Sequence, residues 1–172
     1  MKQSSKEPTI SIRDIKQRIS TGDSEAERLM GLILLDGTGV KKNVNEGFRL
    51  LRESAERGDS TSECDVGFCF HTGQGTNFNC SEAIRYYQLS ANHSNAKGHN
   101  NLGYCLFNGE GTRADQVQAA MHFKISSENN CPEGICNYAR CLEYGDGVPQ
   151  DLRKAAELYK KSADLNNSHA MY

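Results

Sequence analysis

Apolar residues recur along this chain in two short stripes, which together repeat every 36 residues. In one unit the first stripe includes Val66 and Cys69, and the second includes Ala83, Tyr87 and Ala91. Steps of three and four place side chains on one face of an α-helix, whereas a strand alternates at steps of two. The pattern therefore predicts two helices in every unit.

A Gly-x-Gly triplet separates the two stripes of every unit and recurs without insertion or deletion. A fixed period of about 20–50 residues is typical of one supersecondary unit copied in tandem, because each unit stacks on its neighbours to bury its apolar face. Glycine adopts the positive φ that ends the first helix and reverses the chain. The triplets are Gly37/Gly39, Gly73/Gly75, Gly109/Gly111 and Gly145/Gly147. The repeats that they define are residues 23–58, 59–94, 95–130 and 131–166.

Residues suited to helix capping stand at the expected helix starts. A side-chain oxygen at the N-cap accepts a hydrogen bond from a free backbone N–H of the first turn. Glu46, Glu82 and Gln118 each stand three residues after such a cap, which predicts capping boxes. First helices are expected to begin after Asp23, Asp59, Asn95 and Cys131, and second helices after Asn43, Asn79, Asp115 and Asp151.

Small residues share one position inside the first helices: Gly31, Gly67, Gly103 and Ala139. Glycine inside a helix costs about 1 kcal/mol relative to alanine. Its recurrence therefore indicates that two helices cross closely at this position.

The two ends of the chain depart from the repeat. Residues 10–22 match a second helix alone, with Ile12, Ile15 and Ile19 on its apolar face, and are expected to form an N-terminal capping helix. The polar residues 1–9 are expected to be disordered. Residues 167–172 are expected to be the truncated start of a fifth repeat, so the chain is interpreted as part of a longer array. The uncapped C-terminal face is then a candidate for end-to-end self-association.

The fourth repeat carries a pattern that resembles the Sel-1-like repeat family, a relative of the tetratricopeptide repeat. The resemblance covers residues 23–166. Thr76 and Thr112 depart from it at a usual valine, and Gly47 and His122 depart from it at usually apolar positions. The matching residues are Gly134, Tyr138, Ala139, Leu142, Gly145-Asp146-Gly147-Val148, Asp151, Ala155, Tyr159 and Ser162-Ala163.

The resemblance implies an all-α fold. The expected architecture is a right-handed α/α superhelix, a tetratricopeptide-like solenoid of four tandem 36-residue helix-turn-helix repeats plus the N-terminal capping helix. Proteins of this family act as adaptors in signalling and in quality control at the endoplasmic reticulum, and also occur beside kinase domains. Fold alone does not assign a function.

Composition excludes several classes of partner. The formal net charge of the 172-residue chain is −2, too small to favour nucleic acid or an anionic membrane surface. No apolar run approaches the roughly 20 residues that span a bilayer, and the first residues lack the apolar core of a signal peptide. The chain is therefore expected to be cytoplasmic, with no membrane insertion.

Seven cysteines raise the question of disulfides or metal. Cys69, Cys105 and Cys141 share one core position, as Cys64 and Cys136 share another. An odd count without a pairing rule within each repeat favours reduced thiols that act as small buried apolar groups. Metal ligation by residues 131, 136 and 141 is the alternative, but steps of five do not converge on one helix face.

No catalytic constellation emerges from the sequence. The Gly-x-Gly triplets end helices, whereas phosphate-binding glycines follow a strand and open a helix. The five histidines share no repeat position and no partner pattern. Residues such as Glu25 and Glu63 match first-turn helix acids. The chain is therefore expected not to be an enzyme and to hold no metal or cofactor.

Binding of a protein or peptide ligand has more support. By analogy with tetratricopeptide arrays, the first helices are expected to line the concave face. Aromatic and arginine side chains on that face are typical of interface hot spots. Packing of Phe68 and Tyr104 between repeats is the alternative for those two rings. The expected partner-binding residues are Phe68, His71, Thr72, Asn100, Tyr104, Phe107, Asn108, Arg140, Glu143 and Tyr144.

Three hypotheses remain open at this point. The first is a protein–protein interaction scaffold that holds a partner peptide or helix on its concave face. The second is a structural spacer within a larger multidomain protein, for example beside a kinase domain or in a ubiquitin-ligase assembly. The third is an enzyme similar to cysteine-rich secreted members of the family, for which penicillin-binding or β-lactamase-like activity has been proposed; it requires disulfides.

Overall fold

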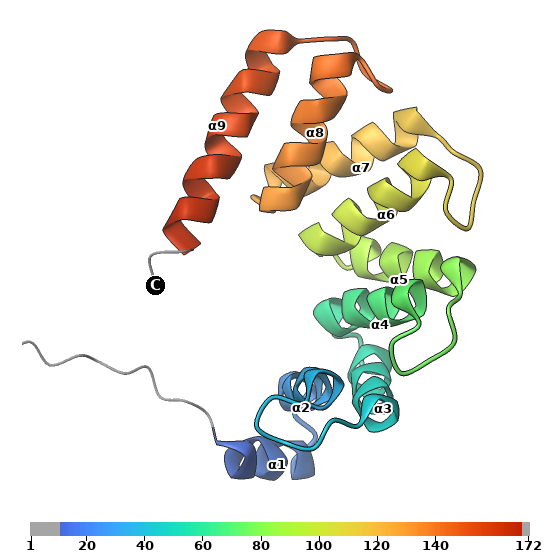
Figure 1. The fold of residues 1–172 in the computed structure, drawn as a ribbon, viewed down its shortest axis with the longest axis vertical. Coiled ribbons are helices and arrows are strands. Elements are labelled where there is room, and N and C mark those ends of the chain that lie inside the picture. The colour runs from blue at the N-terminus through green and yellow to red at the C-terminus, as the bar shows by residue number, and fades with distance from the viewer. Residues whose placement is uncertain (1–10, 170–172) are drawn as a thin grey trace, which may run out of the picture.

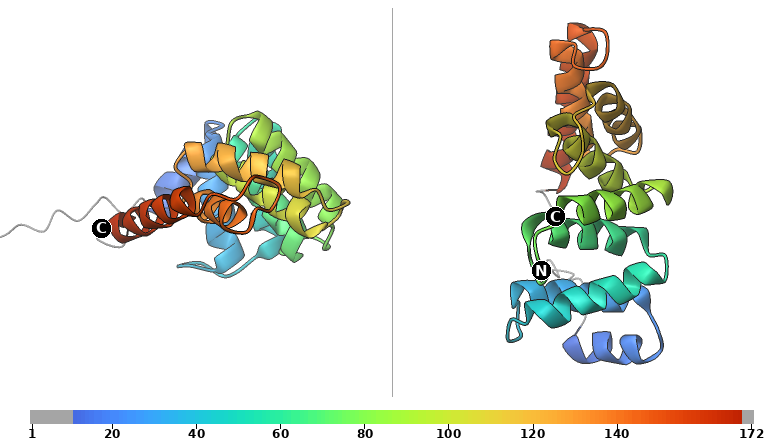
Figure 2. Two further views of the ribbon diagram at one scale, coloured as in Figure 1. Left: turned by 90° about the horizontal axis from the view of Figure 1, so that it is seen from above. Right: turned by 90° about the vertical axis from the view of Figure 1, so that its right-hand side faces the viewer.

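The computed structural model describes residues 11–169, with side chains for residues 11–165. All regular structure in this part of the chain is helical, and the helices follow one another along an arc (Figure 1). Seen from the side, they stack as successive layers along the long axis (Figure 2). The all-α solenoid predicted from the repeat is therefore confirmed.

The helices form hairpins that stack in sequence order. α2 pairs with α3, α4 with α5, α6 with α7 and α8 with α9, and each hairpin contacts the next. Within the described range, no helix is long and apolar enough to cross a membrane. The bounds are α1 Ile12–Ser20, α2 Ser24–Asp36, α3 Val44–Glu56, α4 Ser60–Thr72, α5 Cys80–Asn92, α6 Ala96–Asn108, α7 Gln116–Glu128, α8 Pro132–Tyr144 and α9 Leu152–His169.

The core lies between hairpins as well as within them. Leu51 of α3 and Val66 and Cys69 of α4 belong to one buried cluster, so the first two repeats share a core. At the N-terminal end, Ile15 of α1 is buried against Met30 of α2. The helix expected within residues 10–22 thus lies at Ile12–Ser20 and covers the first hairpin. The expectation for residues 1–9 lies outside the described residues.

The N-caps predicted for the second helices form, but all three predicted capping boxes were wrong. The Asn79 side chain accepts a hydrogen bond from the backbone N–H of Glu82 at 3.1 Å. The Glu82 carboxylate, however, accepts hydrogen bonds from Arg85, one helical turn further on. Glu46 does the same with Arg49. In all three repeats the N–H of the N-cap residue donates instead to a backbone carbonyl of the preceding helix, at Leu34, Phe70 or Leu106. That N–H is therefore not free for the side chain three residues on. A reciprocal capping box does occur in α1.

The two glycines of each triplet have different tasks. Gly73 ends α4 in the left-handed conformation at φ 71°, where other residues pay a steric cost. Gly75 lies against the preceding repeat, and a Cβ there would overlap the Val44 carbonyl oxygen at the start of α3. The first glycine therefore shapes the hairpin, and the second allows the next hairpin to stack.

The close helix crossing predicted at the glycines inside the first helices is confirmed. A Cβ on Gly67 would lie 2.7 Å from the Tyr87 ring, and one on Gly103 would lie 2.8 Å from the Phe123 ring. Large side chains of the second helices thus fill the space that these glycines leave. Tyr87 and Phe123 are among the largest fully buried side chains.

A buried serine closes each hairpin, a feature that was not predicted from the repeat pattern. The serine hydroxyl of each second helix donates a hydrogen bond to a backbone carbonyl at the start of its first helix. Each of these carbonyls stands in the first turn and also accepts the hydrogen bond of its own helix, so the serine uses its second lone pair and ties the two helices together. The bonds are Ser54 to Ser24 O, Ser90 to Ser60 O, Ser126 to Ala96 O and Ser162 to Pro132 O.

The prediction of a new helix beginning in residues 167–172 was wrong for residues 167–169. α9 continues through His169, whereas the other second helices end after 13 residues. In the third repeat Asn130, which is equivalent to residue 166, adopts a φ of 59°, and the chain turns there into α8. Residues 170–172 lie outside the described part.

Candidate functional site

The first helices line the inner side of the arc. α4 contacts α6 and α6 contacts α8, in addition to the contacts within each hairpin. In the described residues, α3, α5 and α7 make no comparable contacts with one another. Helices on the inner side of a curved stack approach one another more closely than those outside. The inner surface is therefore built by α4, α6 and α8 (Figure 1).

Three adjoining hollows run across this surface, and Asn100 borders all of them. Their volumes are about 210, 230 and 510 Å³. We call the combined depression the inner groove. Its principal lining residues are Phe68, His71, Asn100, Asn101, Tyr104, Glu133 and Asn137.

Two aromatic rings form the exposed part of the inner groove. Phe68 on α4 is 51% exposed and Tyr104 on α6 is 45% exposed, so neither ring is part of the core between repeats. The His71 ring lies next to both Tyr104 and the buried Tyr87, with its centroid 6.4 Å and 6.3 Å from theirs. The structure thus brings together four of the residues expected on the concave face, including Asn100.

A row of side-chain amides forms the floor of the inner groove. Asn137 on α8 donates to the Asn100 side-chain oxygen at 2.8 Å, and Asn100 donates to Asn101 at 3.2 Å. Asn101 in turn donates to the Cys64 sulfur at 3.4 Å. Each amide retains donor or acceptor capacity beyond these bonds. Neither Asn101 nor Asn137 was predicted to bind a partner, although both stand at the same repeat position.

The end of the inner groove near α2 is charged. Asp65 on α4 accepts a hydrogen bond from Arg28 at 2.7 Å. Burial raises the pKa of Asp65, and the nearby Arg28 charge opposes that rise. Lys97 and Glu133 line the same hollow and add one charge of each sign. The charges are mixed, so this end does not select strongly for a cationic or an anionic ligand.

Three of the expected binding residues lie at helix ends, away from the three hollows. Thr72, Asn108 and Tyr144 are the last residues of α4, α6 and α8, and all three are exposed. The Thr72 hydroxyl donates to the backbone carbonyl of Phe68 at 2.8 Å. Repeat position correctly predicted that these residues lie on the first helices. In the structure they do not line the inner groove.

Three other expected binding residues pack within the stack. Phe107 lies against the cluster of the last two repeats, with its centroid 6.5 Å from that of Phe123. Arg140 places its guanidinium 4.6 Å from the Phe107 ring centroid, a cation–π contact. Glu143 accepts a hydrogen bond from the Tyr159 hydroxyl at 2.8 Å. The Arg140–Phe107 contact joins the last two repeats, and the other two contacts each lie within one repeat, so none of these residues lines the inner groove.

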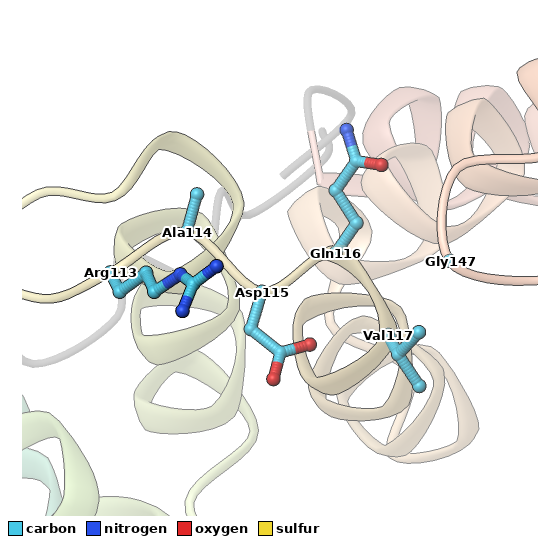
Figure 3. Close-up of a pocket in the computed structure, with 6 residues that line it drawn as sticks. All are labelled: Arg113, Ala114, Asp115, Gln116, Val117 and Gly147. Atoms are coloured by element: carbon cyan, nitrogen blue, oxygen red, sulfur yellow. The ribbon is translucent and has the colours of Figure 1, made fainter.

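A larger hollow of about 720 Å³ lies elsewhere, at the start of α7 (Figure 3). Asp115, Gln116 and Val117 line it, but their side chains point in different directions, and Asp115 caps α7. A similar hollow lies two repeats earlier, at the start of α3, bordered by Gly75. The feature is therefore a consequence of stacking a Gly-x-Gly turn on the preceding helix, and it gathers no chemistry.

Most of the cysteines are buried. All seven are free, and Cys69, Cys105 and Cys141 are buried as predicted. Burial raises the pKa of both Cys69 and Cys105 to about 12, which keeps these thiols protonated near neutral pH when no metal ion is bound. Cys136 is exposed, so the expectation that the cysteines act as buried apolar groups was wrong for this residue.

Two histidines form a pair inside the third repeat. The Nδ1 atoms of His99 on α6 and His122 on α7 lie 3.0 Å apart. Burial lowers the pKa of both rings, and for His122 the nearby His99 lowers it further. Both observations favour neutral rings. The Nδ1–H of one histidine then donates a hydrogen bond to Nδ1 of the other.

We expect this pair to make the protein less stable in mild acid. The unfolded histidines take up protons near their ordinary pKa of about 6.5, whereas the folded ones resist to lower pH, so stability falls as pH drops below about 6.5. His122→Leu introduces the residue that the first and fourth repeats have at this position, Leu50 and Leu158. It should reduce this loss of stability. Urea unfolding at about pH 7.5 and about pH 5.5 measures the loss in the free energy of unfolding for each protein. An equal loss in the two proteins would contradict the assignment.

Comparison with known families agrees with this geometry. The Sel1 repeat family model matches residues 24–59, 60–95, 96–131 and 132–167. The chain belongs to the Sel1 repeat family. Proteins built from Sel1 repeats are generally scaffolds for protein interaction, and the fold is a non-enzymatic scaffold type.

Solved structures of other Sel1 repeat proteins are similar to this chain. A Sel1 repeat protein from Oxalobacter formigenes is 27% identical with a TM-score of 0.78, over 88% of this chain and 63% of that one. The protective antigen c5321 of uropathogenic Escherichia coli is 24% identical with a TM-score of 0.84, over 91% of this chain and 34% of that one. The chain thus spans less than two thirds of the length of either. No curated protein matches it.

Proposed function

We propose that this Sel1 repeat chain is a protein-interaction scaffold that binds an extended segment of a partner protein along the inner groove. The observation that carries the proposal is the pair of half-exposed rings, Phe68 and Tyr104, beside the buried amide of Asn100. A soluble protein gains nothing in stability from large apolar rings left in water, so their exposure at a lined depression favours a binding role.

The groove suits a polypeptide because it offers both kinds of contact that an extended segment needs. Side-chain amides such as Asn100, Asn101 and Asn137 donate and accept hydrogen bonds, as the backbone of an extended peptide also does. Tyr104 buries a large area at a small loss of conformational entropy, as interface hot spots do. We further propose that binding takes place in the cytoplasm, where thiols such as the exposed Cys136 stay reduced.

Tyr104→Ala should weaken peptide binding without unfolding the protein. A library of random peptides displayed on phage is selected against the whole chain, and the dissociation constant of a selected peptide is measured by calorimetry. Loss of a hot-spot tyrosine costs about 2 kcal/mol, which is about 30-fold in affinity. Circular dichroism should show unchanged helicity, because Tyr104 is 45% exposed.

Phe78→Ala is the matched control. Phe78 is also aromatic, and its side chain is 66% exposed. It lies in the turn before α5, outside the inner groove. Its loss should leave the dissociation constant unchanged. Selection of no peptide at all, or equal losses in the two variants, would contradict the proposal. The first of these results would favour a structural spacer within a larger protein.

A further inference from the structure

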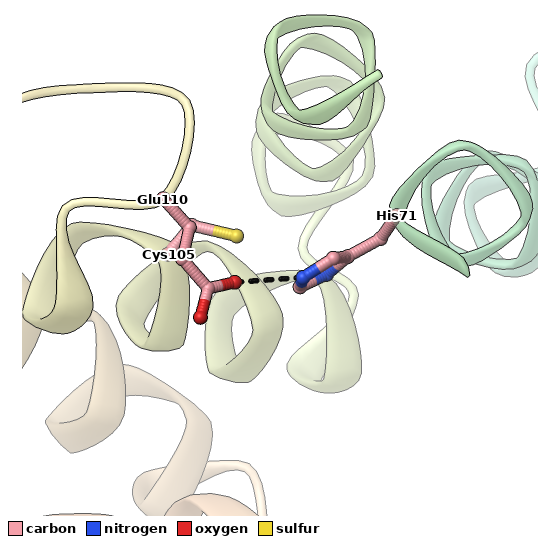
Figure 4. A group of neighbouring side chains, drawn as sticks. All are labelled: His71, Cys105 and Glu110. Atoms are coloured by element: carbon pink, nitrogen blue, oxygen red, sulfur yellow. Dashed lines mark ion pairs between the residues drawn. The ribbon is translucent and has the colours of Figure 1, made fainter. Parts of the chain in front are cut away.

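Three side chains with metal-binding atoms meet where the second and third repeats join (Figure 4). His71 comes from the last turn of α4, Cys105 from α6, and Glu110 from the turn that follows α6. One nitrogen, one sulfur and one oxygen of these residues all lie within 4.8 Å of one another. His71 Nε2 and Glu110 Oε2 are 2.7 Å apart and form an ion pair when His71 is protonated.

The repeat provides an internal comparison for this cluster. One repeat earlier, the same three positions hold Leu35, Cys69 and Gln74, and one repeat later they hold Phe107, Cys141 and Asp146. The cysteine is common to all three and is explained by packing in the core. The histidine and the glutamate occur together only where the second and third repeats join. Stacking alone does not require them, because the neighbouring junctions are built without them.

We propose that His71, Cys105 and Glu110 bind one Zn²⁺ ion. Imidazole, thiolate and carboxylate are the three side-chain ligands that zinc takes in proteins, and three protein ligands leave one position for water. His71 and Glu110 are 23% and 33% exposed, so an ion reaches the cluster from solvent. Cys105 is 1% exposed and supplies the inner side of the site.

The ligands need a small rearrangement to hold the ion. Two ligand atoms at about 2.0–2.1 Å from a tetrahedral ion lie about 3.3 Å apart. The His71 and Glu110 atoms, at 2.7 Å, must therefore separate by roughly half an ångström. Glu110 lies in a turn rather than in a helix, so a rotation of its side chain provides this movement.

Tyr87 lies beside the histidine nitrogen that is not needed for the metal ion. The Tyr87 hydroxyl lies 3.5 Å from His71 Nδ1, the ring nitrogen that does not face Glu110. When Nδ1 carries the proton and donates it in a hydrogen bond to this hydroxyl, the Nε2 lone pair is free for a metal ion. Zn²⁺ displaces the thiol proton of Cys105, which passes to solvent as the zinc–sulfur bond forms. The charge of Zn²⁺ favours the thiolate. The ion also takes the place of protonated His71 as the cation beside Glu110.

Metal titration of the whole chain tests the site. The reduced, metal-free protein is titrated with Zn²⁺ against a chromophoric chelator and, separately, with Co²⁺ followed by absorbance. We expect one equivalent of either ion to bind. We also expect Co²⁺ to give a thiolate-to-cobalt charge-transfer band and the visible bands of a tetrahedral ion, which are independent of any activity.

Variants that copy the neighbouring repeat separate metal binding from folding. His71→Leu and Glu110→Gln introduce the residues found at Leu35 and Gln74, so the fold should tolerate both. Each should weaken Zn²⁺ binding at least about tenfold, since each removes a ligand. Cys105→Ala should abolish the charge-transfer band.

Two further cysteine variants serve as controls. Cys141→Ala changes the equivalent core position one repeat later, and Cys136→Ser removes the exposed thiol. Both should keep the stoichiometry and the charge-transfer band. Absence of Zn²⁺ binding, a band that survives in Cys105→Ala, or Zn²⁺ affinity unchanged in His71→Leu and Glu110→Gln would overturn the proposal.

Discussion

Replacing Phe123 with alanine should lower the free energy of unfolding by about 3–5 kcal/mol. Phe123 is fully buried, and its ring fills the space above Gly103 where a first helix and a second helix cross. The alanine leaves that space empty, because glycine has no side chain to move into it. Urea unfolding followed by circular dichroism measures the loss.

Val117→Ala is the control for Phe123→Ala on the same helix. Val117 is 65% exposed, so its truncation should change the free energy of unfolding by no more than about 0.5 kcal/mol. A loss of less than about 1 kcal/mol for Phe123→Ala would show that the crossing is looser than the structure has it.

Gly147→Ala should be more destabilising than Gly39→Ala, although the two glycines occupy the same position of the repeat. Both have a φ of 70°, so both substitutions carry a backbone cost of about 1–2 kcal/mol. A Cβ on Gly147 also overlaps the Gln116 carbonyl oxygen of the preceding repeat, whereas one on Gly39 meets nothing within 4 Å. Overpacking adds about 1–3 kcal/mol at Gly147.

The pair of variants isolates the contribution of stacking. Backbone strain is matched between them, so the difference in the free energy of unfolding reports the contact between repeats alone. Thermal and urea unfolding of the two proteins measure that difference. Equal losses would mean that the second glycine of the triplet serves only the turn.

The parts of the fold that depend on local sequence were predictable. Helices, N-caps such as Asn79 and helix-ending glycines such as Gly73 each follow from residues within one turn. The absence of a capping box at Glu82 was not predictable from spacing, since the Asn79 N–H donates to the Phe70 carbonyl of the preceding helix and Glu82 bonds Arg85. Nor was the length of α9, which continues through residue 166, where the equivalent Asn130 of the third repeat turns the chain.

The candidate site was only partly predictable, since it depends on pairs of residues about one repeat apart. Repeat position brought Phe68, Asn100 and Tyr104 to the inner face, because the helix register fixes that side. Repeat position could not show that Phe107 turns into the core, because that depends on where the Phe123 ring lies. The meeting of His71 with Glu110 has no local spacing signal at all, because the two belong to different repeats.

A crystal structure of the chain with a selected peptide tests the central claim most directly. Our account predicts an extended peptide that lies across α4, α6 and α8, contacts the rings of Phe68 and Tyr104, and forms a hydrogen bond with Asn100. A peptide bound to the outer helices α3, α5 and α7, or at either end of the stack with the inner groove empty, would contradict it.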